Sequence, residues 1–285
     1  MLPDVTIRRM KLNDITFATE CTAAEKWISE DVHTFKGFYF HDPGGCLLAE
    51  LSGKPVGICI ATSYGESGFI GELIVQAEAR GHGIGTALLN YGANYLKDRG
   101  SKTIYLDGVL KAVPLYERNG FRKVVRSGRF FGKLAGEQHP QIRLMQPEDL
   151  LAVFALDKWA FGADRSFFLR RRLELFPKLC KVMKIGGKIA GYIQGRCGEG
   201  WVSAGPWVMA AGVTEAECLL KSLACEVGNL SISVGVLENN TPAAELLQIL
   251  GFTIREDSPW RMALGPSNNL GASHACCAVG SAAKG

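Results

Sequence analysis

Apolar residues in the first half of the chain form short runs, typical of strands, that alternate with longer stretches of helical spacing. Two of these runs are joined by Ser52-Gly53, a dipeptide typical of a tight hairpin turn. We expect strands over residues 5–10, 46–51, 54–64, 69–75, 103–106, 121–126 and 129–133, and helices over 13–25, 83–97 and 113–118. The pattern therefore predicts a mixed α/β fold.

The second half of the chain repeats the pattern of the first. Four short matches occur in the same order at a nearly constant spacing, which makes them stronger together than any one alone. They are Ile7-Arg8-Arg9-Met10 with Ile142-Arg143-Leu144-Met145, Gly53-Lys54-Pro55-Val56-Gly57 with Gly187-Lys188-Ile189-Ala190-Gly191, Leu88-Leu89 with Leu219-Leu220, and Gly120-Phe121 with Gly251-Phe252. We therefore expect two copies of one fold, over residues 1–138 and 139–265. Residues 266–285 are rich in Gly, Ser, Ala and Asn, and we expect a disordered tail there.

Length, composition and charge limit the kinds of molecule that the chain is expected to bind. The chain has 285 residues, of which 47% are hydrophobic, enough for two domains that each bury a core. No apolar run approaches the roughly 18 residues of a membrane span, and the N-terminus does not resemble a signal peptide. Nine cysteines without a CxxC pair are typical of reduced thiols in a cytoplasmic protein. The net charge of +4 is mild, and Arg170-Arg171-Arg172 is typical of a solvated helix face. We expect no membrane, metal or nucleic-acid partner, while a homodimer stays open.

The most informative segment follows the predicted strand at 69–75. It contains three glycines within five residues, Gly81, Gly83 and Gly85, and then opens an amphipathic helix. Glycines let successive backbone N–H groups converge on an anion, and the helix adds its free N-terminal donors and its dipole. Arg80 and His82 supply further donors, so the segment predicts a pyrophosphate site. A P-loop would need a Gly-Lys-Ser/Thr ending, which is absent. A dinucleotide fold would use a different glycine spacing and place the loop after its first strand.

Two motifs resemble those of the GNAT superfamily of N-acetyltransferases. Arg80-x-x-Gly83-x-Gly85, after Leu73-Ile74-Val75, is similar to the acetyl-CoA motif of that superfamily. The segment from Asp107 to Phe121, which ends in Tyr116-x-x-x-Gly120-Phe121, is similar to its second signature. The resemblance covers residues 5–133, and weaker similarity extends it to a C-terminal GNAT-like domain over 141–265. It implies a tandem GNAT fold: a mixed, mostly antiparallel sheet with two splayed central parallel strands, flanked by helices.

The resemblance also implies the cofactor and its contacts. Acetyl-CoA would be the co-substrate, with its pantetheine arm on the backbone of Leu73 and Val75 and its thioester carbonyl facing the N–H of Ile74. The cofactor-binding residues implied are Leu73, Ile74, Val75, Arg80, Gly81, His82, Gly83, Ile84, Gly85 and Thr86.

Three residues are candidates for proton transfer. Tyr116 is the expected acid for the leaving thiolate, and the competing interpretation is that it packs on Leu88 as ordinary core. Glu72 lies beside the expected acetyl position, where a carboxylate among apolar neighbours can act as base or as an anchor for the substrate ammonium. Asp107 is a second candidate for holding the amine or a bridging water.

The second copy has lost these features. Alignment on Leu219-Leu220 places Ala211, Thr214 and Ala216 at the positions of Arg80, Gly83 and Gly85, with Glu215 and Glu217 inside the loop. Alignment on Gly251-Phe252 places Leu247 at the position of Tyr116. We expect the second copy to be a structural lobe or one that grips the substrate. Candidate contacts with the acceptor are Asp157, Trp159, Asp164 and Arg165. For Trp159, as for Phe161, a position in the core is the favoured interpretation.

The sequence thus predicts an enzyme that acetylates a primary amine of a small molecule from acetyl-CoA. Acetylation of a protein or peptide, and a non-catalytic acyl-CoA sensor, are the alternatives.

Overall fold

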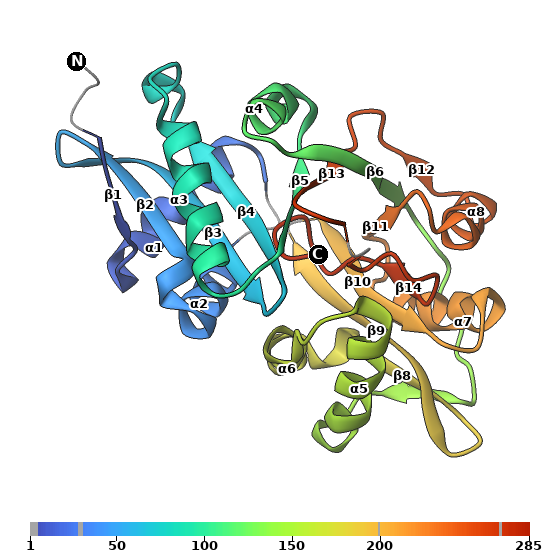
Figure 1. Ribbon diagram of the computed structural model, residues 1–285. Helices are drawn as coiled ribbons and strands as arrows, with labels where there is room; N and C mark the ends of the chain where they lie inside the picture. Colours follow the sequence, from blue (N-terminus) through green and yellow to red (C-terminus); the bar gives the residue numbers. More distant parts are fainter. Residues whose placement is uncertain (1–4, 28–30, 199, 268–269) are drawn as a thin grey trace. The chain divides into compact units, whose positions relative to one another are not determined.

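The computed structural model describes residues 5–27, 31–198, 200–267 and 270–285 (Figure 1). The chain forms two compact units, and neither is continuous in sequence. The first unit contains Met1–Lys123, Met262–Ser267 and Lys284. The second unit contains Val124–Arg261, Asn268–Ala283 and Gly285.

The first unit is a mixed sheet flanked by helices. Its strands lie in the order β1-β2-β3-β4-β5, antiparallel as far as β4, and β4 and β5 run parallel. Its elements are β1 (Val5–Arg9), α1 (Ile15–Ala24), α2 (Val32–His41), β2 (Cys46–Leu51), β3 (Lys54–Tyr64), β4 (Ser67–Val75), α3 (Ile84–Asp98), β5 (Thr103–Gly108) and α4 (Val113–Arg118). This confirms the predicted fold class, including the pair of central parallel strands.

Local sequence accounts for the two strongest features of this sheet. Ser52 and Gly53 both have positive φ, 51° and 76°, as a two-residue hairpin turn between twisted strands requires. Helix α3 packs on β2, β3 and β4 (Figure 1) through its apolar stripe, which includes Leu88 and Leu96. A Cβ at Gly68 on β4 would lie 2.8 Å from Leu96 Cδ1, so glycine lets the helix approach the strand.

The second unit has the same architecture. Its strands lie in the order β6-β11-β10-β9-β8-β7, with β12 beside β6 and β14 beside β10. Its elements are β6 (Arg122–Gly132), β7 (Ile142–Leu144), α5 (Leu150–Phe161), α6 (Ser166–Leu175), β8 (Cys180–Ile185), β9 (Lys188–Gly198), β10 (Trp201–Met209), α7 (Val213–Ala224), β11 (Ser231–Leu237), α8 (Thr241–Ile249), β12 (Thr253–Ile254) and β14 (Cys276–Ala278).

The structure confirms the internal repeat and gives its register. The bounds of α6, β8, β9 and β10 each lie 134 positions after those of α2, β2, β3 and β4. A local ion pair recurs as well. The guanidinium of Arg8 binds the carboxylate of Asp14 at 2.6 Å, and that of Arg143 binds Asp149 at 2.6 Å. Each aspartate also accepts the backbone N–H at the start of its short helical turn.

The two repeats exchange their closing strands. Strand β6 belongs to the first repeat but pairs with β11 of the second unit. The last residues of β13 (Trp260–Leu264) belong to the second repeat but lie in the first unit, next to β5. The unit boundary at Lys123 therefore differs from the expected boundary at residue 138. An unpaired sheet edge can accept a strand from elsewhere in the chain, and sequence composition does not tell which copy provides it.

The C-terminal segment differs from the expected disordered tail. Residues 276–278 form β14, and Leu270, Cys276, Cys277 and Ala278 are buried. The small side chains that suggested disorder allow close packing when a sheet edge supplies hydrogen bonds. Helix α2 was not expected from the apolar pattern. It begins after Asp31, whose carboxylate accepts the N–H of Thr34 at 2.8 Å.

Three expectations for the second copy are also settled. Phe161 is buried as expected, whereas Trp159 is 63% exposed and is not part of the core. Asp157 and Arg165, candidate acceptor contacts in the sequence, are instead buried against each other. Arg165 binds Asp157 through Nε at 2.9 Å and Nη2 at 2.8 Å, and the Tyr192 hydroxyl donates to the same carboxylate.

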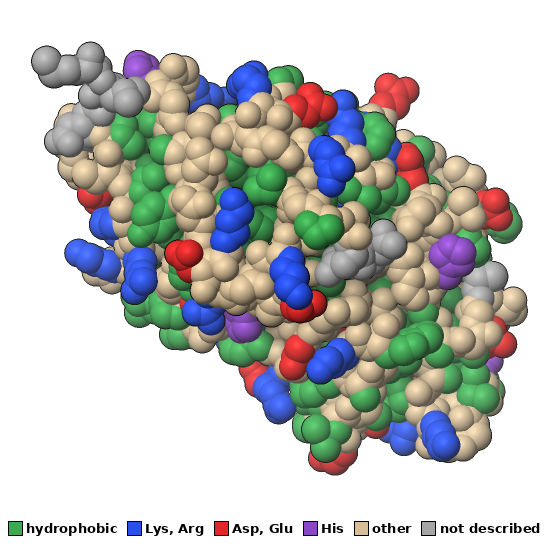
Figure 2. Space-filling model, in the orientation of Figure 1, with side chains coloured by type: hydrophobic (Ala, Val, Ile, Leu, Met, Phe, Trp, Pro, Cys, Tyr) green, Lys and Arg blue, Asp and Glu red, His purple; other side chains and the backbone are tan. Residues whose placement is uncertain are grey.

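The side chains of Lys and Arg are interspersed with those of Asp and Glu on the face drawn in Figure 2. In the part of the chain that the structure describes, no helix is both long enough and apolar enough to span a bilayer.

The buried pair gives a stability prediction. Asp157→Asn keeps the side-chain shape but leaves the Arg165 guanidinium buried without a counter-charge, so the free energy of unfolding should fall by about 3–5 kcal/mol. The matched control is Asp257→Asn, which breaks a similar two-bond pair with Arg255 that is 55% and 62% exposed. That change should cost under about 1 kcal/mol. Denaturant unfolding measures both, and equal losses would contradict the structural role of Asp157.

Candidate functional site

The site begins where the two parallel strands of the first unit diverge. Strands β4 and β5 pair from Ser67↔Thr103 to Ile70↔Leu106, and no pair joins the two strands beyond that point in the described residues. Strand β4 continues to Val75 with β3 on its other side. Leu73, Ile74 and Val75 therefore lie on a stretch whose edge toward β5 is not closed by that strand. This is the splay that the sequence predicted.

Glu72 lies on a bulge at the start of this stretch. Ile58 pairs with Ile74 and Ile60 with Gly71, so two residues of β4, Glu72 and Leu73, face the single residue between them on β3. Glu72 has a φ of 48°, a conformation that side chains rarely adopt, and it is 6% exposed. Strained backbone of this kind is often found at functional sites.

The glycine-rich loop leads from β4 to the N-terminus of α3. Gly81 and Gly83 have φ of 84° and 77°, and Gly83 precedes the helix without a side-chain cap. The first N–H groups of α3, at Ile84, Gly85 and Thr86, lack intrahelical acceptors because of their position in the helix. A Cβ on Gly81 or Gly83 would meet nothing within 4 Å, so the space beside these two glycines is open. The loop thus has the form of an anion cradle.

Two basic residues, Arg80 and His82, lie within the cradle loop on either side of Gly81. The Nε of Arg80 donates to the carbonyl of Val75 at 2.9 Å, which folds the guanidinium back along the loop. The Nδ1 of His82 lies 3.3 Å from the carbonyl of Ala79. Both residues lie on the loop between β4 and α3, and their role as donors to a phosphate stays a prediction.

Two further residues join the cradle that the sequence did not indicate. Glu25, at the end of α1, binds the guanidinium of Arg80, and its other oxygen lies 2.7 Å from the Nζ of Lys111. Burial acts to raise the pKa of Glu25, but hydrogen bonds from Lys111 and Arg80 outweigh it and lower that pKa. The three residues lie far apart in sequence, and no local pattern connects them. The carboxylate holds two cations beside the cradle and leaves a net positive charge there.

Tyr116 is buried on α4. Its ring lies over Gly108, where a Cβ would come within 2.9 Å of the ring, and it meets the ring of Phe121 edge to face at 6.1 Å. Burial raises the pKa of Tyr116, and the nearby Cys59 and Glu72 raise it further. Tyr116 and Glu72 therefore influence each other electrostatically. Asp107 is half-buried in β5, directly before Gly108.

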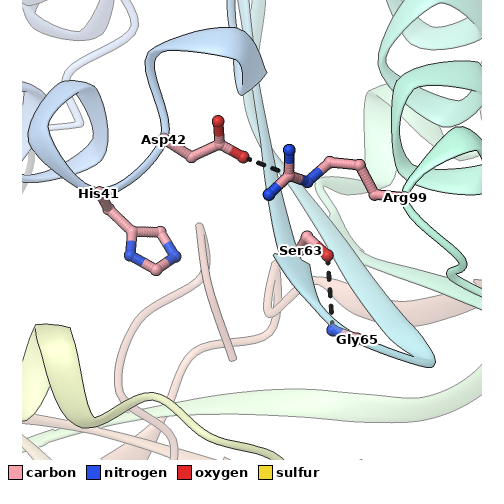
Figure 3. Close-up of a pocket in the computed structure, with 5 residues that line it drawn as sticks. All are labelled: His41, Asp42, Ser63, Gly65 and Arg99. Carbon is pink, nitrogen blue, oxygen red and sulfur yellow. Dashed lines mark hydrogen bonds and ion pairs between the residues drawn. The ribbon is translucent and has the colours of Figure 1, made fainter.

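A separate cavity lies at the other end of α3. It has a volume of about 560 Å³ and is lined by His41, Asp42, Ser63, Gly65 and Arg99 (Figure 3). Arg99 follows the C-terminus of α3, a helix of 15 residues that spans roughly 22 Å from the cradle. Asp42 accepts hydrogen bonds from the Tyr95 hydroxyl at 2.8 and 2.7 Å and lies 3.7 Å from the Arg99 Nε. The cavity is therefore polar and distinct from the cradle.

In its described residues, the second unit lacks the features of this site. Eight residues, 76–83, connect β4 to α3, but only three, 210–212, connect β10 to α7, so the cradle loop is shortened. The repeat spacing of 134 places Pro206 at the position of Glu72. Leu247 on α8 is fully buried where the first repeat has Tyr116.

Comparisons with known proteins agree with both units. Residues 12–121 match the Acetyltransferase (GNAT) family, and residues 153–274 match the Acetyltransferase (GNAT) domain. The chain therefore belongs to the GNAT family of acetyltransferases and carries two GNAT domains in tandem.

Curated relatives match over part of their length. An uncharacterized N-acetyltransferase of Methanocaldococcus jannaschii is 35% identical over 99 residues, which cover 31% of this chain and 44% of the relative. A mycothiol acetyltransferase of Thermobispora bispora is 36% identical over 107 residues, 34% of this chain and 36% of the relative. The chain thus spans less than half the length of these relatives.

Solved structures share the fold over nearly the whole chain. A putative acetyltransferase of Pyrococcus horikoshii superposes with a TM-score of 0.82 at 23% identity, covering 99% of this chain and 96% of that one. A tandem GNAT protein from the clavulanic acid biosynthesis pathway superposes with a TM-score of 0.63 at 15% identity, covering 93% and 100%.

The ion pairs of Glu25 with Arg80 and Lys111 give a prediction for the dependence of stability on pH. Because the folded-state pKa of Glu25 is lowered, its contribution to stability is present above the ordinary carboxyl pKa and is lost as pH falls through the folded value. Glu25→Gln should lower the free energy of unfolding by on the order of 1 kcal/mol at pH 7. This difference should begin to shrink as pH falls below the ordinary carboxyl pKa of about 4.3 and should vanish once pH is below the lowered folded pKa. Glu66→Gln is the control, since Glu66 pairs with Lys102 but is 74% exposed. A Glu25→Gln difference that stays constant down to pH 3 would contradict this assignment.

Proposed function

We propose that the chain transfers an acetyl group from acetyl-CoA to a primary amine of a small molecule, by direct attack in a ternary complex. The observation that carries the proposal is the first unit's splayed strand pair, with an open anion cradle at one end and Tyr116 and Glu72 beside it. GNAT membership supports acetyl-CoA as the co-substrate.

The residues present fit acetyl-CoA. The open space at Gly81 and Gly83 and the free N–H groups of the first turn of α3 suit a pyrophosphate. Arg80 and Lys111 add two cations whose orientation Glu25 fixes. The backbone of Leu73 and Val75, on the edge that β5 leaves, would hold the pantetheine amides by hydrogen bonds of the kind that pair strands.

The residues around the splay can perform the transfer. Acetyl-CoA supplies the thioester, the amine nitrogen forms a bond to the acetyl carbon, and the carbon–sulfur bond breaks. The N–H of Ile74 points to β3, because Ile74 pairs with Ile58 two positions from the bond between the Gln76 N–H and the Val56 carbonyl. An N–H on the opposite edge of β4 would therefore have to stabilise the negative charge that develops on the carbonyl oxygen. Glu72 would take the amine proton or anchor the ammonium, with Asp107 as the second candidate. Tyr116, whose raised pKa keeps the phenol protonated, would give its proton to the leaving thiolate.

The acceptor that we propose is a primary amine of a small molecule. The relatives named for mycothiol support a small molecule rather than a protein. A screen of thiol release from acetyl-CoA across amines, amino acids and peptides tests this choice. Release with peptides alone would favour peptide acetylation, and binding without release under any condition would favour a sensor.

The cradle gives the first test of this function. Acetyl-CoA should raise the melting temperature of the protein. Gly83→Glu should remove the shift, because it places a carboxylate where the pyrophosphate would bind. Gly53→Glu is the control, since Gly53 has a φ of 76° and equally open surroundings but lies in the β2–β3 turn. The control should keep the full shift, and a full shift in Gly83→Glu would mean that the cofactor binds elsewhere.

Tyr116 gives the second test. Tyr116→Phe keeps the ring on Gly108 and removes only the hydroxyl, so cofactor affinity and stability should hardly change. The chemical step, followed by single-turnover kinetics, should slow by roughly 10²-fold. If the rate stays within about twofold of wild type while the chemical step limits turnover, Tyr116 only packs in the core and is not the acid.

A further inference from the structure

The parallel strands of the second unit diverge at the same place as those of the first. Strands β10 and β11 pair from Trp201↔Ser231 to Ala204↔Val234, and Ala204 lies 134 positions after Ile70, where β4 and β5 part. Strand β10 then continues to Met209, as β4 continues to Val75. Both units therefore contain a splay of the same register.

In the second unit this splay is filled by the chain itself. Strand β14 takes the edge of β10 that β11 leaves, with Trp207 opposite Ala278 and Val208 opposite Cys276 (Figure 1). The N–H of Met209 donates to the carbonyl of Ala275 at 2.9 Å. On the other side, the N–H of Val279 donates to the carbonyl of Gly235, in β11, at 2.9 Å. The segment thus hydrogen-bonds to both diverging strands.

The fit of this segment is close. Cys276, Cys277 and Ala278 are 7%, 4% and 1% exposed. A Cβ at Gly235 would lie 2.7 Å from a methyl group of Val279, so glycine makes room for the segment. The amide of Asn240, itself 2% exposed, donates to the carbonyls of His274 at 3.0 Å and Cys276 at 2.9 Å. Side-chain and backbone donors both hold the segment in place.

The backbone groups involved correspond to those of the proposed cofactor site. At the repeat spacing of 134, Trp207 and Met209 take the positions of Leu73 and Val75. Secondary amides of a polypeptide and of pantetheine offer the same N–H and C=O groups to a strand edge. The same edge can therefore be satisfied by either ligand.

We propose that the second unit is a binding site for an extended peptide strand, occupied in cis by residues 275–279 in the place where the first unit takes pantetheine. The occupant closes this splay to acyl-CoA, so the whole chain binds one acyl-CoA. The comparison with pantetheine rests on the proposed function, whereas the occupancy by the chain's own strand does not.

The test displaces the occupant and follows its cysteines. Ala278→Asp places a carboxylate in the filled splay, and Ala282→Asp makes the same change at an exposed position three residues beyond the segment. Labelling with a thiol reagent, resolved by peptide mass spectrometry, uses the exposed Cys197 and Cys225 as internal references. Cys276 and Cys277 should react at least tenfold faster in Ala278→Asp than in wild type, and at the wild-type rate in Ala282→Asp.

A peptide added in trans tests the site itself. A synthetic peptide of residues 270–283, with serine in place of both cysteines, should bind Ala278→Asp in calorimetry and should not bind wild type. Val279→Pro, which removes the N–H donated to Gly235 together with the valine methyl groups, provides a second displaced variant if Ala278→Asp does not fold. Binding of the peptide to wild type and variant alike, or failure to bind either displaced variant, would overturn the proposal.

Calorimetry with acetyl-CoA separates this proposal from the proposed function. Wild type should bind one acetyl-CoA per chain. Two molecules per chain would overturn the occluded second site and leave the proposed function standing. No binding at all would overturn the proposed function, while the labelling and peptide results would still decide the occupancy of the second splay.

Discussion

Two parallel strands that diverge inside a sheet leave backbone N–H and C=O groups that no neighbouring strand satisfies. Such groups are costly to bury without hydrogen bonds, so each diverging pair needs an occupant of its own. This constraint arises twice in the chain, after Ile70 and after Ala204, at positions 134 residues apart. In the second unit residues 275–279 satisfy it. In the first unit we propose that pantetheine does.

The other features of the first unit gather around its splay. The bulge that follows the divergence gives Glu72 its positive φ and its buried position. The strand end then leads directly into the glycine loop, so the cradle N–H groups and the free strand edge lie along one path. The side chain of Tyr116 reaches the same region because Gly108 offers no Cβ to obstruct its ring. One interruption in strand pairing therefore lies beside the glycine loop, Glu72 and Tyr116, the features to which we assign cofactor binding and proton transfer.

The second unit has the same fold without the features to which we assign cofactor binding in the first unit, as far as the structure describes it. Its connection between β10 and α7 is five residues shorter than that between β4 and α3, and this removes the cradle. Pro206 and Leu247 replace the titratable groups. The core nevertheless remains extensive, from Ile193 on β9 to Leu219 and Leu220 on α7 and Leu247 on α8. Burial of apolar surface holds the sheet and helices together, so the fold does not depend on the catalytic features.

The sequence by itself determined whatever depends on neighbours along the chain. The hairpin at Ser52-Gly53, the glycine loop before α3, the order of strands and the internal repeat could all be read from it, because turn chemistry and apolar periodicity are local. Only the tertiary structure decided contacts between distant segments: Glu25 between Arg80 and Lys111, the exchange of β6 and β13, and the burial of Asp157 against Arg165. The C-terminal segment illustrates the difference. Its small polar and apolar residues show no alternation typical of a strand. Residues 276–278 nevertheless form a strand, because the edge of β10 supplies hydrogen-bond partners that no local sequence pattern predicts.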